Sequence, residues 1–188
     1  MVTKYFKVEE IMRKIFLVLV LVLIAATGCS QQRQEPKGQA GYPGGAAVVI
    51  SPEEMRLLEQ TAKQSPKNAA AWTALGNALM DSNRFGEAAD AYQKALALDP
   101  KNVDVRVDMG TCLKNSGRPQ QAVEEYRKAI KINPNHIYAH RNMGVVLAFD
   151  LKDKKEAARE FEKYLALAPN APDAGEIRQM VQNLKSGQ

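Results

Sequence analysis

Hydrophobic and polar positions follow a helical period over most of the chain. From residue 51 onward, apolar side chains recur at spacings of three and four residues, which places them on one face of an α-helix. Trp72, Leu75 and Leu79 have this spacing in one segment, and Ala88 and Tyr92 have it in the next. The pattern predicts an all-α domain of eight helices without strands.

The helical pattern also repeats at a fixed distance along the chain. Proline stands at positions 66, 100, 134 and 169, at intervals of 34, 34 and 35 residues. Between these prolines, each unit carries an apolar first segment with a central glycine and a second segment with the pattern Ala-x-x-x-Tyr/Phe. A period of this length indicates stacked helix pairs that share a continuous core. The third unit contains one extra residue, between Ala148 and Ala157.

Glycines inside the first helices predict close helix packing, and residues in the turns predict a left-handed backbone conformation. A glycine costs about 1 kcal/mol relative to alanine inside a helix. The recurrence of glycine at Gly76, Gly110 and Gly144 therefore predicts that the partner helix approaches closely at these positions. Asn83 and Gly117 fall between paired helices, where the left-handed conformation favours these residue types.

Local signals also mark the ends of helices. Ser51 to Glu54 has the form of a capping box, which predicts a leading helix before the first unit. Asn68 and Asn102 follow two of the periodic prolines by two residues and are predicted N-caps. Apolar residues at helical spacing predict a trailing helix over residues 173–185.

These units resemble the tetratricopeptide-repeat (TPR) family, with three copies in phase over residues 69–171. The resemblance implies a right-handed all-α solenoid of three helix pairs with one capping helix at each end. The predicted parts are a leading cap helix (51–68), three repeats (69–102, 103–136 and 137–171) and a C-terminal cap helix (172–188).

In this family, the first helices of successive repeats line a groove that binds a peptide or protein segment. The resemblance therefore implies a protein-binding function and no enzymatic activity. The alternative is that these residues only face solvent and that a partner uses the convex face or a helix end. Tyr138, Arg141 and Phe149 are the predicted anchors, because aromatic and Arg side chains often dominate binding energy, although Phe149 could instead pack on the trailing helix. The implied groove residues are Asn77, Met80, Asp81, Asp104, Val107, Thr111, Lys114, Asn115, Tyr138, Arg141, Val145 and Phe149.

One subtype of the family does not fit. Chaperone-cofactor arrays hold a partner's terminal carboxylate with Lys, Asn and Arg at fixed groove positions. Only Asn77 matches that set, whereas Thr73, Asp108, Tyr138 and Asn142 stand at the other positions. A carboxylate clamp is therefore not predicted.

The N-terminal segment has a different pattern. Residues 15–26 form a run of twelve uncharged apolar residues preceded by Arg13-Lys14. This run is shorter than the roughly 20 residues of a membrane-spanning helix. It is typical of a secretory signal peptide, predicted over residues 1–28, with Met12 as the expected initiator.

The end of this run resembles the lipobox of bacterial lipoproteins. A small residue precedes Cys29, although Ala26 stands where Leu is commonest in that family. The resemblance implies lipid chains on Cys29 and hence a stable membrane anchor. The alternative is an ordinary signal peptide with an incidental cysteine. Ser30 stands where an Asp would imply inner-membrane retention, so the resemblance implies the periplasmic face of the outer membrane.

Residues 29–50 connect this anchor to the helical part. They are rich in Gln, Gly and Pro and show no helical or strand period, which predicts a flexible tether of roughly 25 Å. Residues 46–50 are apolar, and we expect them to pack loosely against the leading helix.

Charge and candidate chemistry exclude several function classes. The formal net charge is +5, and residues 1–28 hold four of the 26 bases and two of the 21 acids, which leaves a net of +3. This balance is too weak and too mixed to indicate nucleic acid. His136 and His140 lie four apart but lack a Cys or carboxylate cluster, so no metal site is predicted. Cys112 is a predicted small buried hydrophobe.

No phosphate-binding loop or nucleophile motif is present, so the sequence predicts neither an enzyme nor a cofactor beyond the lipid. Three functions remain open. The first is a membrane-tethered adaptor that binds a protein of unknown identity. The second is an assembly factor of an envelope machine, similar to type IV pilus or secretin pilotins. The third is an accessory to a cell-wall enzyme.

Overall fold

A computed structural model describes residues 50–187. The predictions for the signal peptide, for Met12 and Cys29, and for the tether before residue 50 lie outside the described residues. Ile50 itself is half-buried against the helical core, as expected for the end of the apolar stretch. Within the described part, no helix has the length and apolar character needed to cross a membrane.

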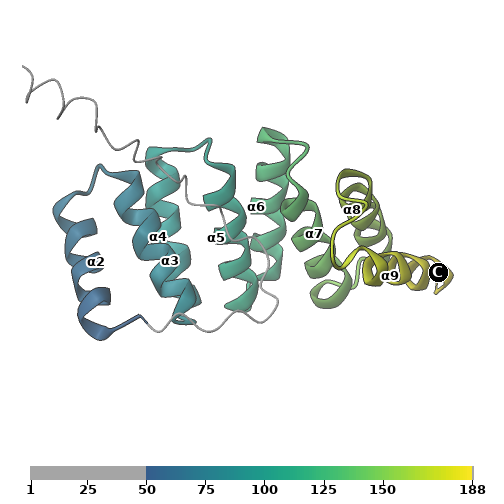
Figure 1. Cartoon of the computed structure of the whole chain (residues 1–188), viewed down its shortest axis with the longest axis horizontal. Helices are drawn as coiled ribbons and strands as arrows, with labels where there is room; N and C mark the ends of the chain where they lie inside the picture. Colours follow the sequence, from purple (N-terminus) through teal and green to yellow (C-terminus); the bar gives the residue numbers. More distant parts are fainter. Residues whose placement is uncertain (1–49, 188) are drawn as a thin grey trace, which may run out of the picture. The chain divides into compact units, whose positions relative to one another are not determined.

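The described residues form α-helices that pack in consecutive pairs, together with one short π-helix, η1 (Figure 1). α3 packs on α4, α5 on α6 and α7 on α8, with α2 and α9 at the two ends. The predicted all-α array of three helix pairs with a helix at each end is confirmed. The bounds are α2 (Pro52–Gln64), α3 (Ala69–Asp81), α4 (Phe85–Leu98), α5 (Val103–Asn115), α6 (Pro119–Ile132), α7 (Ile137–Val145), η1 (Val146–Asp150), α8 (Lys154–Leu167) and α9 (Ala174–Ser186).

The first helices begin where the sequence predicts. The side chains of Ser51, Asn68 and Asn102 each accept a hydrogen bond from a backbone N–H in the first turn of α2, α3 and α5. In the third repeat His136 takes this place, and its Nδ1 accepts from the N–H of Ala139 at 3.1 Å. The sequence analysis missed this cap, because histidine is not a usual capping residue.

The turns between paired helices contain one left-handed residue each. Asn83 (φ 58°) and Gly117 (φ 77°) have the predicted conformation, and Lys152 (φ 60°) is the equivalent residue of the third repeat. Lys152 is displaced by one position because η1 absorbs the extra residue of this repeat. There, the N–H of Leu151 donates to the carbonyl of Val146 at 3.0 Å, five residues back.

An aromatic ring from the second helix lies on each mid-helix glycine of the first helix. These rings are among the largest fully buried side chains. A Cβ placed at either of the first two glycines would lie 2.5 Å from a ring carbon, and at the third it would lie 2.7 Å away. The predicted close approach is thus confirmed. The pairs are Gly76 with Tyr92, Gly110 with Tyr126, and Gly144 with Phe161.

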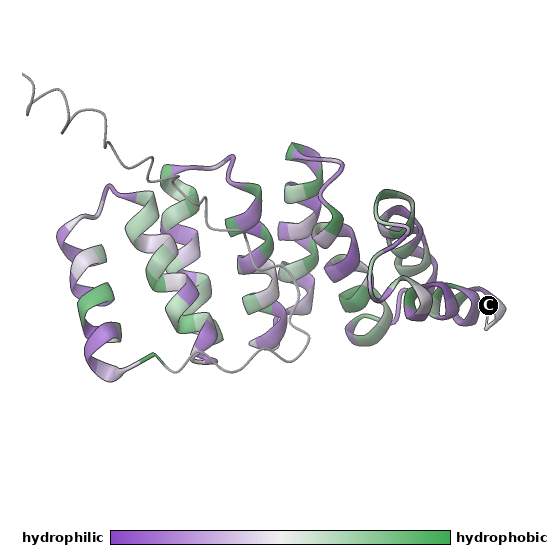
Figure 2. Ribbon diagram, in the orientation of Figure 1, coloured by the Kyte–Doolittle hydropathy of each residue, from purple (hydrophilic) through white to green (hydrophobic). Residues whose placement is uncertain are grey.

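The core is one cluster that runs from Met55 in α2 to Val181 in α9. Hydrophobic and hydrophilic residues alternate along each helix in Figure 2, as expected of amphipathic helices. Cys112 is fully buried in this core, as predicted, and burial raises the pKa of its thiol to about 12.

Candidate protein-binding face

The predicted groove residues lie on α3, α5, α7 and η1, and we call the surface that they form the first-helix face. All of them except Val107 are at least partly exposed. Val107 is only 2% exposed and belongs to the core, so its assignment to the groove is wrong. The central first helix, α5, has helices packed on both sides, and an apolar side chain at this position is covered by them.

In the first two repeats, the buried tyrosine reaches through to the first-helix face. The hydroxyl of Tyr92 donates to Oδ1 of Asn77 at 2.8 Å. The hydroxyls of Tyr126 and Thr111 lie 3.2 Å apart. Two predicted groove residues, Asn77 and Thr111, are thus the hydrogen-bond partners of buried tyrosine hydroxyls. A buried hydroxyl without such a partner costs about 1–3 kcal/mol.

The third repeat lacks both members of this bond. Phe161 stands in the place of the two tyrosines, and Val145 stands in the place of their polar partners. The ring without a hydroxyl thus occurs with an apolar residue at the face. We infer that the interior determines the residue type at this position in every repeat.

Two further groove residues are held from the neighbouring repeat. Nδ1 of His136 accepts a backbone hydrogen bond, so Nε2 carries the proton and donates to Oδ1 of Asp104 at 2.9 Å. The ring of Tyr138 lies edge-on to the His136 ring, with centroids 6.3 Å apart. These contacts join α5 to the beginning of α7 and fix both side chains at the face.

Arg141 is paired with the residue that precedes α9, and its role as a binding anchor stays a prediction. Its Nε donates to Oδ2 of Asp173 at 2.5 Å, and the hydroxyl of Tyr164 donates to the other oxygen. Burial opposes the ionisation of Asp173, but the hydrogen bonds from Tyr164 and Arg141 outweigh it and lower the pKa of this carboxyl. Since Asp173 directly precedes α9, this cluster positions the helix against the third repeat.

A hollow of about 510 Å³ lies between η1 and α9, at the end of the first-helix face. Phe149 forms part of its wall and is 53% exposed, so it stands beside the trailing helix without being buried by it. The sequence analysis missed the α9 residues, because that helix was assigned only a capping role. The continued proline period at position 169 was the available signal, since it starts α9 where another first helix would begin. The wall residues are Ala148, Phe149, Glu176, Gln179, Met180, Asn183 and Leu184.

Asp108 lies on α5 with its side chain half-buried. Burial, together with the charges of Asp104 and Asp81, raises the pKa of this carboxyl to about 7. No ion pair joins Asp108 to a basic side chain of residues 50–187. The centre of the face is therefore acidic.

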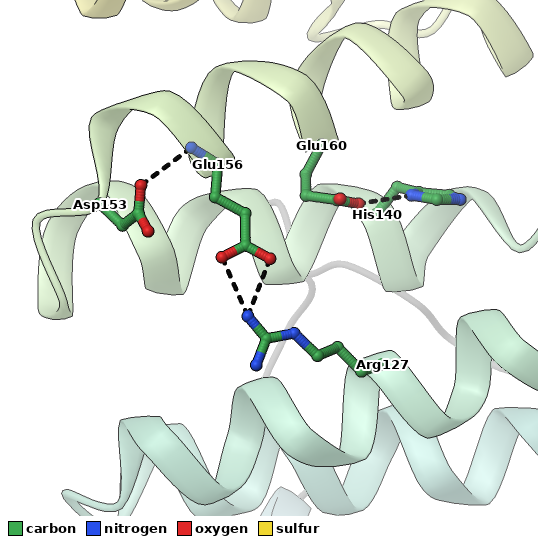
Figure 3. A network of polar contacts seen from close by, with 5 residues as sticks. All are labelled: Arg127, His140, Asp153, Glu156 and Glu160. Atoms are coloured by element: carbon green, nitrogen blue, oxygen red, sulfur yellow. Dashed lines mark hydrogen bonds and ion pairs between the residues drawn. The ribbon is translucent and has the colours of Figure 1, made fainter.

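Polar contacts of α6, α7 and α8 join helices both between and within repeats (Figure 3). Arg127 of α6 donates to both carboxylate oxygens of Glu156 in α8, at 2.8 and 2.9 Å. His140 lies 2.7 Å from the carboxylate of Glu160, and the bond with Glu160 raises the pKa of His140. These contacts involve side chains of α6, α7 and α8.

Trp72 and its equivalents in the other two repeats make the same hydrogen bond to the backbone. Trp72, Arg106 and His140 each donate an N–H to the carbonyl of the proline six residues earlier, at 3.1, 2.8 and 2.9 Å. Both ring nitrogens of His140 are thus engaged. Among the described residues, no group of three or more His, Cys, Asp or Glu side chains is placed to hold a metal ion.

Comparison with known proteins agrees with this architecture. Residues 50–174 match the family described as cytochrome c-type biogenesis protein H TPR domain. A crystal structure of the MamA protein superposes with a TM-score of 0.65 at 20% identity, over 71% of this chain and 72% of that one. The first TPR of Spaghetti (RPAP3), solved bound to the HSP90 peptide SRMEEVD, superposes with a TM-score of 0.58 at 25% identity, over 62% and 93%. No curated protein matches the sequence significantly.

The tyrosine contacts generate a stability test in the third repeat. Phe161→Tyr alone places a buried hydroxyl against Val145 and should destabilise the protein by about 1–3 kcal/mol. Adding Val145→Thr supplies the partner found in the second repeat, and we expect it to recover about 1 kcal/mol or more. Chemical unfolding followed by circular dichroism measures both changes, with Val145→Thr alone as the control. Strictly additive effects would show that the interior does not set this face position.

Proposed function

The chain belongs to the family of cytochrome c-type biogenesis protein H TPR domains, and we propose that it is a membrane-tethered adaptor that binds a segment of another protein. The observation that carries this proposal is the hollow between η1 and α9. It lies at the end of the first-helix face, and its wall includes a half-exposed phenylalanine, Phe149.

The size and lining of this hollow support a bound side chain of a partner. Its volume of about 510 Å³ lies within the roughly 300–1,000 Å³ of typical ligand pockets. Phe149, Met180 and Leu184 supply apolar surface, and the polar side chains between them can orient a backbone. A peptide is also the ligand of RPAP3 in the similar structure, which supports this class of partner.

The chemistry of the face argues against the terminal-carboxylate mode of recognition. A carboxylate held near the centre of the face would meet Asp108, which already lies in an environment unfavourable to negative charge. Like charges brought together at an interface oppose binding. We therefore propose an internal segment of the partner, and not its free C-terminus, as the ligand.

The family description supplies one pathway to consider beside a general adaptor. A role in cytochrome c biogenesis is the second candidate, because the matched domain carries that description. Both candidates use the same face, so the identity of the bound partner decides between them.

The remaining part of the proposal concerns the membrane. We propose that Cys29 is lipidated, that residues 30–50 act as the tether, and that the helical array faces the periplasm from the outer membrane. The apolar run that ends at Thr27-Gly28-Cys29 supports this arrangement.

Site-specific photocrosslinking tests where the partner binds. Gln179→benzoylphenylalanine places the probe in the wall of the hollow, and Gln121→benzoylphenylalanine places it on α6 as the matched control. We expect a discrete adduct in whole membranes from position 179 only, and a loss of most of it after Phe149→Ala. Circular dichroism verifies that Phe149→Ala leaves the melting temperature unchanged, as its exposure suggests. An adduct from position 121 only would place the partner on the other side.

Mass spectrometry of the membrane fraction tests the anchor. We expect a mature protein that begins at Cys29 and carries the added mass of the lipid chains. Cys29→Ser should abolish both the processing and the membrane association. Mature protein that still begins at Met1 or Met12 would refute the lipoprotein assignment.

A further inference from the structure

The third repeat contains a buried histidine whose two ring nitrogens both face oxygen acceptors. His140 of α7 is 5% exposed. Its Nδ1 lies 2.7 Å from a carboxylate oxygen of Glu160 in α8 (Figure 3), and its Nε2 lies 2.9 Å from the carbonyl of Pro134. A neutral imidazole carries one N–H, whereas the imidazolium carries two. Only the charged ring can therefore donate both of these hydrogen bonds.

The other two repeats match the donors at this position to the acceptors around it. Arg106, the equivalent residue of α5, has several N–H groups and donates to both Glu125 and the preceding proline carbonyl, at 2.6 and 2.8 Å. Trp72, the equivalent residue of α3, has one N–H and donates it to the proline carbonyl. Ala91 stands there in the place of the glutamate. The carboxylate thus occurs with the cationic side chain and is missing beside the neutral one, which places His140 with Arg106.

Neighbouring groups act on the His140 ring in opposite directions. The hydrogen bond with Glu160 is the largest effect and raises the pKa of His140. Burial and the charge of Lys163 lower this pKa, and the bond to the backbone carbonyl raises it further. The result is a pKa above the ordinary value of 6.5.

Ionisable side chains of the other elements that pack on α7 have partners of their own. In η1, the charge of Asp150 acts on the buried hydroxyl of Tyr126. The remaining pairs are Arg127 of α6 with Glu156, Asp104 of α5 with His136, and Arg141 of α7 with Asp173.

The contribution of His140 to stability therefore depends on pH in a definite direction. Its pKa is higher in the folded protein than the value of about 6.5 expected in the unfolded chain. A group with this shift stabilises the fold fully below about pH 6.5, and its contribution is lost as the pH rises through the folded-state pKa. The neutral ring has one N–H for two acceptors, so one of the two bonds is then broken.

We propose that His140 makes the contact between α7 and α8 pH-sensitive, held by the imidazolium and weakened when the ring loses its proton. Because α7 continues directly into η1, the contact lies next to the segment that carries Phe149. The inference goes beyond the proposed function, since it concerns the third repeat itself and does not require a bound partner.

Nitrogen-15 NMR of the histidine-labelled full chain in non-ionic detergent, without a histidine tag, tests the protonation state. The chain has two histidines, and His140→Arg assigns their signals. We expect the His140 ring to carry a proton on both nitrogens at about pH 6.5 and to titrate above that pH. Glu160→Gln should lower the pH at which it titrates. A neutral His140 ring at about pH 6.5 would overturn the proposal.

His140→Arg converts the third repeat to the arrangement of the second and tests the effect on stability. Arginine can make both bonds and does not lose its proton in proteins. In urea unfolding followed by circular dichroism, the unfolding equilibrium constant of the parent should rise about three- to tenfold more between about pH 6 and pH 9 than that of His140→Arg. The difference between the two proteins is decisive, because Asp108, whose pKa is raised to about 7, titrates in both of them.

Two further variants complete this test. His136→Asn removes the other histidine and introduces the cap residue of the first two repeats, so the pH dependence of the parent should persist in it. Arg106→His should add a second loss of stability at high pH, because it places an imidazole between the same kinds of acceptor. Equal pH dependence of the parent and His140→Arg would contradict the proposal, as would an Arg106→His protein no more pH-dependent than the parent. Disappearance of the effect in His136→Asn would assign it to the wrong histidine.

Discussion

The contact between an aromatic ring and a glycine, made once in each helix pair, is the constraint on which the rest of the array depends. Each ring sits where a Cβ at the glycine would be, which fixes how closely the two helices pack. The same ring directs its para position toward the first-helix face. A tyrosine there needs a polar partner at the face, and a phenylalanine accepts Val145. The core thus determines part of the surface that a partner meets.

The end of the array depends on a second arrangement, the carboxylate of Asp173 shared by Arg141 and Tyr164. This cluster seats α9 beside η1 and thereby creates the hollow that the proposed function uses. The π-helix contributes as well, because its extra residue lies in the segment that carries Phe149 and Asp150. Features that look like departures from a regular repeat are therefore concentrated where we propose that binding occurs.

Most of the fold could be predicted from the sequence, because it depends on short-range patterns. The proline period, the mid-helix glycines and the turn residues Asn83 and Gly117 each report a local requirement of the backbone. Side-chain roles at the face depend on residues about 30 positions away, which periodicity does not reveal. Val107 is buried by neighbouring helices, and Arg141 pairs with Asp173, which lies beyond α8 at the beginning of α9. The hollow was missed for the same reason, since α9 contributes most of its wall.

Methionine methyl NMR gives the most direct test of the central claim, that a partner binds along the first-helix face toward α9. Met180 lines the hollow and Met80 lies on the face, whereas Met109 lines a hollow on the α4–α6 side and Met55 belongs to the core at α2. During titration of the labelled full chain with the partner segment that crosslinks at position 179, we predict that the Met180 signal shifts most and that Met80 also shifts. Shifts confined to Met109 or Met55 would contradict the claim.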